Sequence, residues 1–179
     1  MNRDIANAFR SRLIAAHRGA RSLAPENTLA AARAALASGA GMWKIDVRMS
    51  RDGELVVIRK VVDLVRRLGA AEKVLISSFN HYYLALAKRL DRGISTGVLV
   101  NRFQSDPLRL VLGLDAFTYN PGSRAVQPRQ IRRLKQKGFR VLVWVLNNPW
   151  LAKTFFVMGA DGIFTDFPQR FSKHERQNL

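Results

Sequence analysis

The sequence has no cysteine, few acidic residues and no long apolar run. The absence of cysteine excludes disulfides, thiolate metal sites and cysteine nucleophiles. No apolar run approaches the ~18 to 20 residues that a membrane-spanning helix needs, and residues 1–19 lack the apolar core of a secretory signal. No glycine-rich nucleotide-binding motif follows an apolar strand segment. We therefore expect a soluble, cytoplasmic protein.

Positive charge is in large excess. Thirty lysine and arginine residues stand against thirteen aspartate and glutamate residues, which gives a formal net charge of +17. Such a balance favours anionic partners, among them phosphate esters, phospholipid surfaces and nucleic acids. The basic residues are scattered and are not interleaved with aromatic residues, so we do not expect a nucleic-acid groove. A phosphate-bearing small molecule and an anionic membrane surface are the partners that remain.

Short apolar segments alternate with amphipathic segments along the chain. Strands are predicted near residues 12–17, 43–47, 54–60, 74–79, 95–100, 140–147 and 162–166. Helices are predicted at 25–39, with Asn27 or Thr28 as cap, and at 61–73, 80–91, 127–138 and 149–160. Residues 112–123 are expected to be irregular. Strands that alternate with helices of this length pair in parallel through right-handed crossovers, so the pattern predicts an α/β protein.

Polar residues gather where the predicted strands end, at His17-Arg18, Asp46, Arg59-Lys60, Ser77-Ser78 and Asn147. A (β/α)8 barrel takes its chemistry from the C-terminal ends of several strands, so this pattern favours a barrel. Asp166, just ahead of Pro168, is interpreted as a turn former. No linker or repeat divides the chain, and residues 1–179 are expected to form one domain with terminal extensions at 1–12 and 170–179.

Five segments carry motifs in a characteristic order: "IAAHRGARSLAPENTLAAARAALASGA", "IDVRMSRDGELVVI", "VLISSF", "GFRVLVWVLN" and "GADGIFTDFP". Together they resemble the glycerophosphodiester phosphodiesterase family over roughly residues 13–168. The resemblance implies a TIM barrel of the phospholipase-C-like phosphodiesterase type. It also implies hydrolysis of glycerophosphodiesters to sn-glycerol 3-phosphate and an alcohol, with a divalent cation, Ca²⁺ or Mg²⁺, as cofactor.

Five residues correspond to site positions of that family. Hydrolysis of a phosphodiester needs neutralisation of the non-bridging oxygens, a base for the nucleophile and an acid for the leaving alkoxide. His17 resembles the family's first acid/base histidine, and Arg18 resembles its phosphate-contacting arginine. Glu26 is expected either to bind substrate or to cap the following helix. Phe79 is expected to line the substrate pocket, and Trp144 either stacks on the glycerol moiety or is a core residue.

The segment from residue 43 to 60 departs from the family pattern. The family has Glu-x-Asp where this sequence has Lys44-Ile45-Asp46, and carboxylates at i and i+2 would face the cation together. Asp46 therefore keeps one metal-ligand position, whereas a protonated Lys44 cannot bind a cation. The family's second histidine is replaced by Arg59, whose pKa above ~12 prevents proton transfer near neutral pH. Arg59 is assigned instead to substrate binding.

The chain is also shorter than a full barrel. The strand beginning at Leu75 follows Arg59 too closely to leave room for the family's third metal carboxylate, and no Glu-x-Lys strand is found. A loss at residues 59–61 would remove one barrel strand and make the barrel incomplete. Its two unpaired edges would have to be covered, re-paired or shared with a second subunit, so an oligomer is one expectation.

Three hypotheses stay open for this divergent site. The first is decay of the site to impaired activity, the second is hydrolysis through a rearranged set of residues, and the third is a non-catalytic, metal-independent module that binds phosphate. Relative to the family pattern, the substitutions at 44, 59 and 60 all add positive charge, which repels a divalent cation. We therefore expect a member with weakened glycerophosphodiester hydrolysis, for which the cation is doubtful.

Overall fold

The computed structural model describes residues 12–46, 62–63, 66–67 and 74–171, and for Ile45 and Asp46 it describes the backbone alone. Several predictions lie outside these residues: the strand at 54–60, Arg59, the junction at 59–61 and most of both terminal extensions. Phe171, which falls in the segment predicted as the C-terminal extension, is fully buried. Among the described residues no helix has the length and apolar character that crossing a membrane requires.

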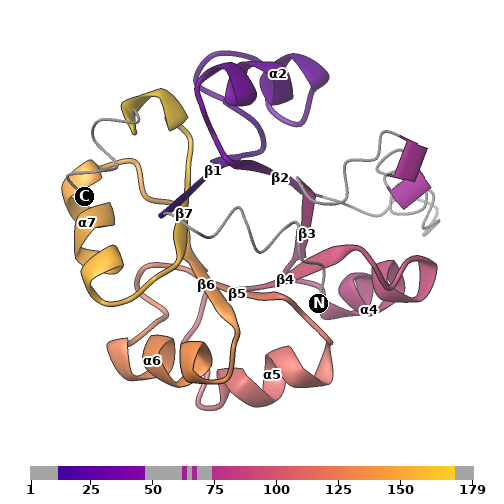
Figure 1. Cartoon of the computed structure of the whole chain (residues 1–179), viewed down its shortest axis with the longest axis vertical. Helices are drawn as coiled ribbons and strands as arrows, with labels where there is room; N and C mark the ends of the chain where they lie inside the picture. The colour runs from indigo at the N-terminus through magenta and orange to yellow at the C-terminus, as the bar shows by residue number, and fades with distance from the viewer. Residues whose placement is uncertain (1–11, 47–61, 64–65, 68–73, 172–179) are drawn as a thin grey trace.

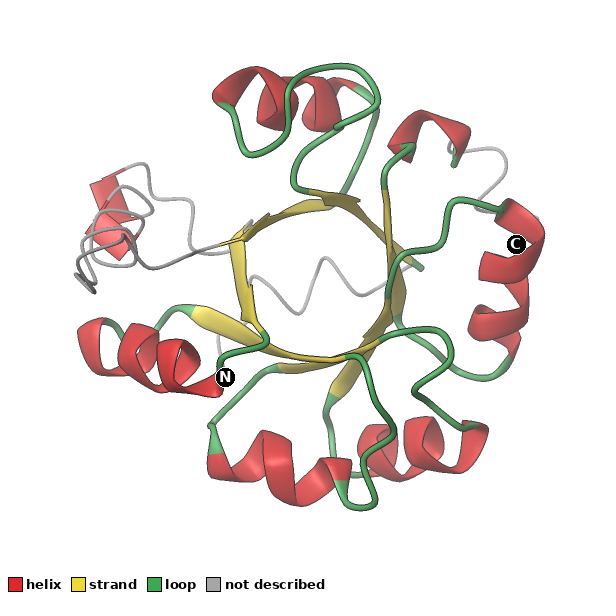
Figure 2. Ribbon diagram, turned by 180° about the vertical axis from the view of Figure 1, so that it is seen from behind, coloured by secondary structure: helices red, strands yellow, loops and turns green. Residues whose placement is uncertain are grey.

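Seven parallel strands form a closed barrel with helices around it (Figures 1 and 2). They are β1 (Leu13–His17), β2 (Met42–Asp46), β3 (Val74–Ser78), β4 (Ser95–Val100), β5 (Thr118–Pro121), β6 (Arg140–Val143) and β7 (Gly162–Thr165). Each strand pairs with the next along the chain, and β1 pairs with β7 to close the ring. The predicted α/β, TIM-barrel-like fold is therefore confirmed, with seven strands in place of the usual eight.

The ring closes because β2 pairs directly with β3. Trp43 stands opposite Val74 and Lys44 opposite Leu75, so the two strands that flank the predicted loss form a continuous ladder. The unpaired edges were expected to be covered, re-paired or shared with a second subunit. In the structure they are re-paired, because β2 and β3 pair with each other. No second subunit is needed to satisfy the backbone groups of β2 and β3.

Four of the described helices, α2, α4, α6 and α7, begin where the sequence signals predict, whereas α5 and η1 were not predicted. They are α2 (Leu29–Ala37), α4 (His81–Leu90), α5 (Pro107–Gly113), α6 (Pro128–Gln136) and α7 (Pro149–Val157), followed by the 3₁₀ helix η1 (Pro168–Arg170). The Thr28 side chain accepts a hydrogen bond from the backbone N–H of Ala31, so Thr28 is the N-cap of α2. Gly39 follows the end of that helix with φ +75°, which favours glycine. Glu26 is therefore not the cap.

The expectation of an irregular segment at 112–123 is wrong. The segment contains β5 and is preceded by the short helix α5, which is capped by Asp106 and has Pro107 in its first turn. The strand has only four residues and includes Asn120 and Pro121, so it lacks the apolar alternation by which a strand is recognised. Thr118 and Asn120 are nevertheless completely buried.

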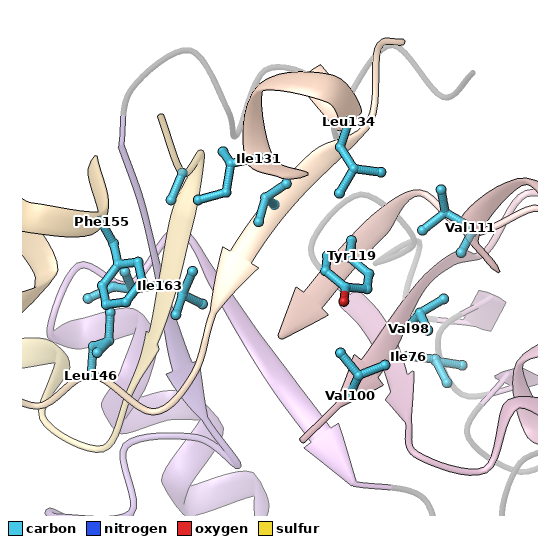
Figure 3. Packing of buried hydrophobic residues seen from close by; sticks show 14 of the residues in the cluster. Ile76, Val98, Val100, Val111, Tyr119, Ile131, Leu134, Leu146, Phe155 and Ile163 are labelled. Carbon is cyan, nitrogen blue, oxygen red and sulfur yellow. The ribbon is translucent and has the colours of Figure 1, made fainter. Parts of the chain in front are cut away.

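The apolar core has two layers. The larger lies between the barrel and its helices, where Ile131 and Leu134 of α6 and Val111 of α5 pack with strand residues such as Tyr119 (Figure 3). The smaller includes Leu13, Ala15, Met42, Leu75, Leu142 and Phe164. These residues alternate along the strands with the members of the larger cluster, so they fill the inside of the ring.

A polar layer accompanies that inner cluster. The Asn120 side chain donates a hydrogen bond to Ser77 Oγ at 3.1 Å, and both side chains are buried. A Cβ on Gly97 would overlap Asn120 Nδ2 and Thr118 Oγ1 and would lie 3.0 Å from Ser77 Oγ. Gly97 is thus required because polar side chains from β3 and β5 occupy the space next to its backbone.

Candidate active site

The chemistry-bearing residues lie together at one end of the barrel. His17 ends β1, Ser78 ends β3, and Trp144 directly follows β6. Because all seven strands are parallel, their C-terminal ends meet at the same face of the barrel, which we call the catalytic face. The topology confirms this convergence for the described strand ends, whereas Arg59 and Lys60 lie outside the described residues.

His17 is held by a carboxylate from the opposite end of the sequence. Its Nδ1 lies 2.9 Å from Asp166 Oδ1. Asn147 fixes that carboxylate, because its Nδ2 donates to Asp166 Oδ2 at 3.0 Å while its Oδ1 accepts the backbone N–H of Asp166 at 2.9 Å. With Nδ1–H donated to the carboxylate, Nε2 is the ring nitrogen left to exchange a proton with a substrate.

The surroundings of His17 and Asp166 set the charge states of these two side chains. Burial lowers the pKa of His17, the Asp166 hydrogen bond opposes that effect in part, and the nearby positive charge of Lys44 lowers it further. Burial alone would raise the pKa of Asp166, but hydrogen bonds from Asn147 and His17 outweigh it and lower that pKa. Near neutral pH the site therefore holds a neutral imidazole beside an ionised carboxylate, which suits His17 to act as a base.

Lys44 is the charge that most changes the character of the site. It stands opposite His17 in the parallel register of β1 and β2, and only 3% of its surface is exposed. A buried ammonium group is costly unless anionic or polar groups compensate it. The positive charge lies where the family resemblance implies a metal carboxylate.

Arg18 and Glu26 form the rim beside His17. Arg18 Nη1 donates to Glu26 Oε1 at 2.8 Å, and Arg21 approaches the other Glu26 oxygen at 3.4 Å. Arg21 also lies 3.6 Å from Asp166. Glu26 therefore orients two arginines at the catalytic face. This role differs from the helix capping and the direct substrate binding that the sequence left open.

Phe79 and Trp144 pack against each other. Their ring centroids are 5.5 Å apart with an angle of 84° between the planes, an edge-to-face contact. Trp144 Nε1 donates to the backbone oxygen of Asn120 at 2.8 Å, whereas Phe79 is 54% exposed. Trp144 is thus fixed but not fully buried, and the role of Phe79 in lining a substrate pocket stays a prediction.

The described side chains do not fit a divalent cation. Among the residues whose side chains the structure describes, no group of three or more His, Asp or Glu is arranged to hold a metal ion. Glu26 and Asp166 are engaged by arginine and by His17, and Lys44 brings a positive charge to the end of β2. The backbone of Asp46 ends β2 opposite Ser77, and its side chain lies outside the description. We therefore derive no chemical step through a metal.

Sequence reasoning missed the most important neighbour of His17. Asp166 was interpreted as a turn former, but it is the hydrogen-bond partner of the imidazole. The two residues are 149 positions apart and meet because β1 pairs with β7. The signal available in the sequence was position: Asp166 directly follows the last strand, as His17 ends the first.

A pocket of about 670 Å³ lies at the other end of the barrel. It is lined by residues that precede β4, β5 and β6, including Lys88, Arg92, Phe117 and Phe139. The N-terminal ends of the strands form this face, where barrels of this class carry no catalytic groups. The pocket therefore does not compete with the catalytic face as the place of the chemistry.

Comparison with known protein families gives one match that covers most of the chain. The Glycerophosphoryl diester phosphodiesterase family matches residues 17–59 and 58–170. The chain belongs to this family. A glycerophosphodiester phosphodiesterase from Caldanaerobacter subterraneus is 22% identical over 230 aligned positions, which cover 88% of this chain and 95% of that protein.

Solved structures share the fold of this family member. A putative glycerophosphoryl diester phosphodiesterase from Silicibacter pomeroyi is similar with a TM-score of 0.77 and 18% identity, over 98% of this chain and 97% of that one. A phosphodiesterase from Oleispira antarctica, in complex with the product sn-glycerol-3-phosphate, is similar with a TM-score of 0.75 and 21% identity, over 97% and 99%. At these identities the likeness supports the barrel fold.

The family match breaks where the sequence predicts a loss. Its two parts meet at residues 58–59, next to the predicted junction at 59–61. The alignment with the Caldanaerobacter subterraneus protein extends over 230 positions, more than the 179 residues of this chain, so that relative has residues that this family member lacks. The shortening is therefore internal.

Proposed function

We propose that this family member hydrolyses glycerophosphodiesters slowly, with His17 as its acid/base residue and without a divalent cation. The observation that carries the proposal is the hydrogen-bonded chain from Asn147 through Asp166 to His17. Such a chain fixes the tautomer and the orientation of the imidazole, which is what a proton-transferring histidine needs.

The chemistry that these residues support is attack of water on phosphorus. Nε2 of neutral His17 would take a proton as the new P–O bond forms, and the P–O bond to the alcohol would break. The imidazolium would then return the proton to the leaving alkoxide, giving sn-glycerol 3-phosphate and an alcohol. Because Arg59 replaces the second histidine, one residue would serve both transfers, and we therefore propose a low rate.

Phosphate charge would be neutralised by side chains in place of a cation. Lys44 and Arg18 bring positive charge to either side of His17, and fixed charges at the catalytic face stabilise the anionic transition state. The Oleispira antarctica phosphodiesterase holds sn-glycerol-3-phosphate. That complex supports a phosphate-bearing small molecule as the ligand of the same fold.

The test is turnover of glycerophosphocholine at high protein concentration, with EDTA and with added Ca²⁺ or Mg²⁺. The proposal expects turnover in EDTA and a loss of about 10²-fold or more in His17→Ala, since general acid/base catalysis contributes that much. His81→Ala is the matched control, because His81 lies on α4 with its Nε2 3.4 Å from the Leu99 carbonyl. No turnover in any condition, or an equal loss in both variants, would contradict it.

The burial of Lys44 favours one second candidate, a metal-independent module that binds phosphate without hydrolysing it. An ammonium group attracts an anion by its charge, and this attraction requires no proton transfer. This candidate expects sn-glycerol 3-phosphate to bind equally well with and without EDTA, measured by calorimetry, in a protein that shows no turnover. Absence of binding in both conditions removes it.

A further inference from the structure

Exposed apolar side chains are concentrated at the catalytic face. The described residues include ten large hydrophobic side chains with high exposure, and seven of them follow a strand or lie in the first turn of the next helix. The seven are Leu23, Leu29, Phe79, Tyr82, Phe103, Trp150 and Leu151. The remaining three, Leu36, Leu112 and Val157, lie at the C-terminal ends of helices.

The barrel topology turns this sequence pattern into a surface. In a parallel βα barrel every strand ends, and every following helix begins, at the same face. The seven side chains come from the segments after β1, β3, β4 and β6, and these strands are distributed around the ring (Figure 1). Exposed apolar side chains gathered on one face mark an interaction surface rather than the random scatter of single residues.

Trp150 is the most exposed member of this group, at 79%. It lies in the first turn of α7, where the Asn148 side chain accepts hydrogen bonds from the backbone N–H groups of Trp150 and Leu151 and so fixes the turn. Leu151 beside it is 45% exposed. Tryptophan and tyrosine favour the boundary between lipid and water, because their rings are apolar and carry one polar group.

Positive charge accompanies the apolar residues. Five exposed arginines belong to the same face: Arg102, Arg109, Arg124, Arg129 and Arg170. Three acidic side chains described at this face lie beside an arginine: Glu26 beside Arg18 at 2.8 Å, Asp106 beside Arg133 at 3.5 Å, and Asp166 beside Arg21 at 3.6 Å. An apolar surface accompanied by exposed arginines is complementary to a bilayer that contains anionic lipids.

We infer that the catalytic face docks on an anionic lipid bilayer, with Trp150, Leu151 and Phe103 entering the interface and the arginines contacting lipid phosphates. Docking would bring His17 to the level of the headgroups. On the basis of the proposed function, the substrate class is then a phosphodiester carried by a membrane lipid, in addition to water-soluble glycerophosphodiesters. The docking itself does not depend on turnover.

The experiment is sedimentation of the whole protein with vesicles of phosphatidylcholine and phosphatidylglycerol, compared with vesicles of phosphatidylcholine alone. We expect binding to the anionic vesicles that weakens as salt rises. Trp150→Ala/Leu151→Ala is expected to weaken binding about tenfold or more, because the two side chains provide much of the buried apolar area. Val157→Ala/Leu112→Ala is the matched control, since these side chains are 76% and 60% exposed at the opposite face; it is expected to bind as wild type does.

The outcomes separate docking from catalysis. Equal binding by both double variants, or no binding to anionic vesicles, overturns the inference, as does a Trp150-dependent dimer in solution that accounts for the exposed face. Turnover of soluble glycerophosphocholine is measured on the same samples. If vesicles bind but the soluble substrate is not hydrolysed, docking stands and the proposed function fails. If the soluble substrate is hydrolysed but the vesicles do not bind, the proposed function stands and docking fails.

Discussion

Lys44 on β2 stands in register with His17 on β1, and the buried ammonium group lowers the pKa of the imidazole. The cation expected from the family pattern would also repel a proton on His17. Lys44 therefore reproduces one electrostatic effect of a metal ion at this position, the lowering of the His17 pKa, although it cannot provide open coordination sites.

The pKa of His17 can be measured by NMR titration. We expect it below the ordinary value of 6.5, because burial and Lys44 both disfavour the imidazolium. Lys44→Met removes the repulsion but keeps an unbranched chain, so the pKa of His17 should rise. A His17 pKa unchanged by the substitution would contradict the assigned proximity.

The same pKa predicts how stability depends on pH. The unfolded chain protonates His17 near pH 6.5, but the folded protein does so only at lower pH. In that window the unfolded state binds more protons, so the free energy of unfolding falls as pH decreases below about 6.5. Urea unfolding of wild type and His17→Gln between pH 5 and 8 measures this. The decline should be smaller in the variant, and an equal decline in both would assign it to other groups.

Asp166→Asn tests the positioning of His17. The amide keeps the shape of the carboxylate but removes the charge that holds Nδ1–H, and kcat should fall by about 10²-fold while KM changes little. A structural role alone would instead lower the unfolding temperature without a selective loss of kcat. The NMR signal of His17 should also shift, since the Asp166 hydrogen bond raises its pKa.

Lys44→Glu/Arg59→His tests whether the family's metal chemistry can be recovered. If the rest of the barrel is competent, turnover of glycerophosphocholine by this double variant should increase with Ca²⁺ or Mg²⁺ and be lost in EDTA. Wild type, assayed beside it, should respond to neither addition. A double variant that stays independent of metal would assign the defect to the internal shortening.

Gly97→Ala tests the polar layer inside the barrel. The added Cβ would overlap Asn120 and Thr118, both buried, so we expect a loss of about 1 to 3 kcal/mol in the free energy of unfolding. Gly113→Ala is the control, because nothing lies within 4 Å of a Cβ at that position, the last residue of α5. A comparable loss in both variants would contradict the packing argument.

Capping residues and apolar runs predicted the helices and strands whose positions depend on the nearby sequence alone. Thr28 and Gly39 mark the ends of α2 as capping rules require, and the apolar runs of β3 and β7 were recognised at nearly their observed positions. The strand β5 was missed because its inward residues, Thr118 and Asn120, are polar. Inside a closed ring a polar residue can be satisfied by a neighbouring strand, and periodicity along one strand does not reveal that.

The candidate site was predictable only in part, for the same reason. His17, Arg18 and Trp144 lie in recognisable motifs, and the structure brings them to one face. The contact of Asp166 with His17 depends on ring closure across 149 positions, so no local pattern contains it. The sequence showed that Lys44 replaces a carboxylate of the family pattern. It did not show that Lys44 is buried, because side-chain burial in a strand depends on the neighbouring strands.

The direct pairing of β2 with β3 has a consequence for the evolution of the chain. The parallel ladder of β2 and β3, which runs from Trp43 opposite Val74 to Asp46 opposite Ser77, closes this part of the ring. The connection between the two strands is therefore free to vary in length at little cost in backbone pairing. Evolution can thus gain or lose sequence between these two strands while the rest of the ring persists.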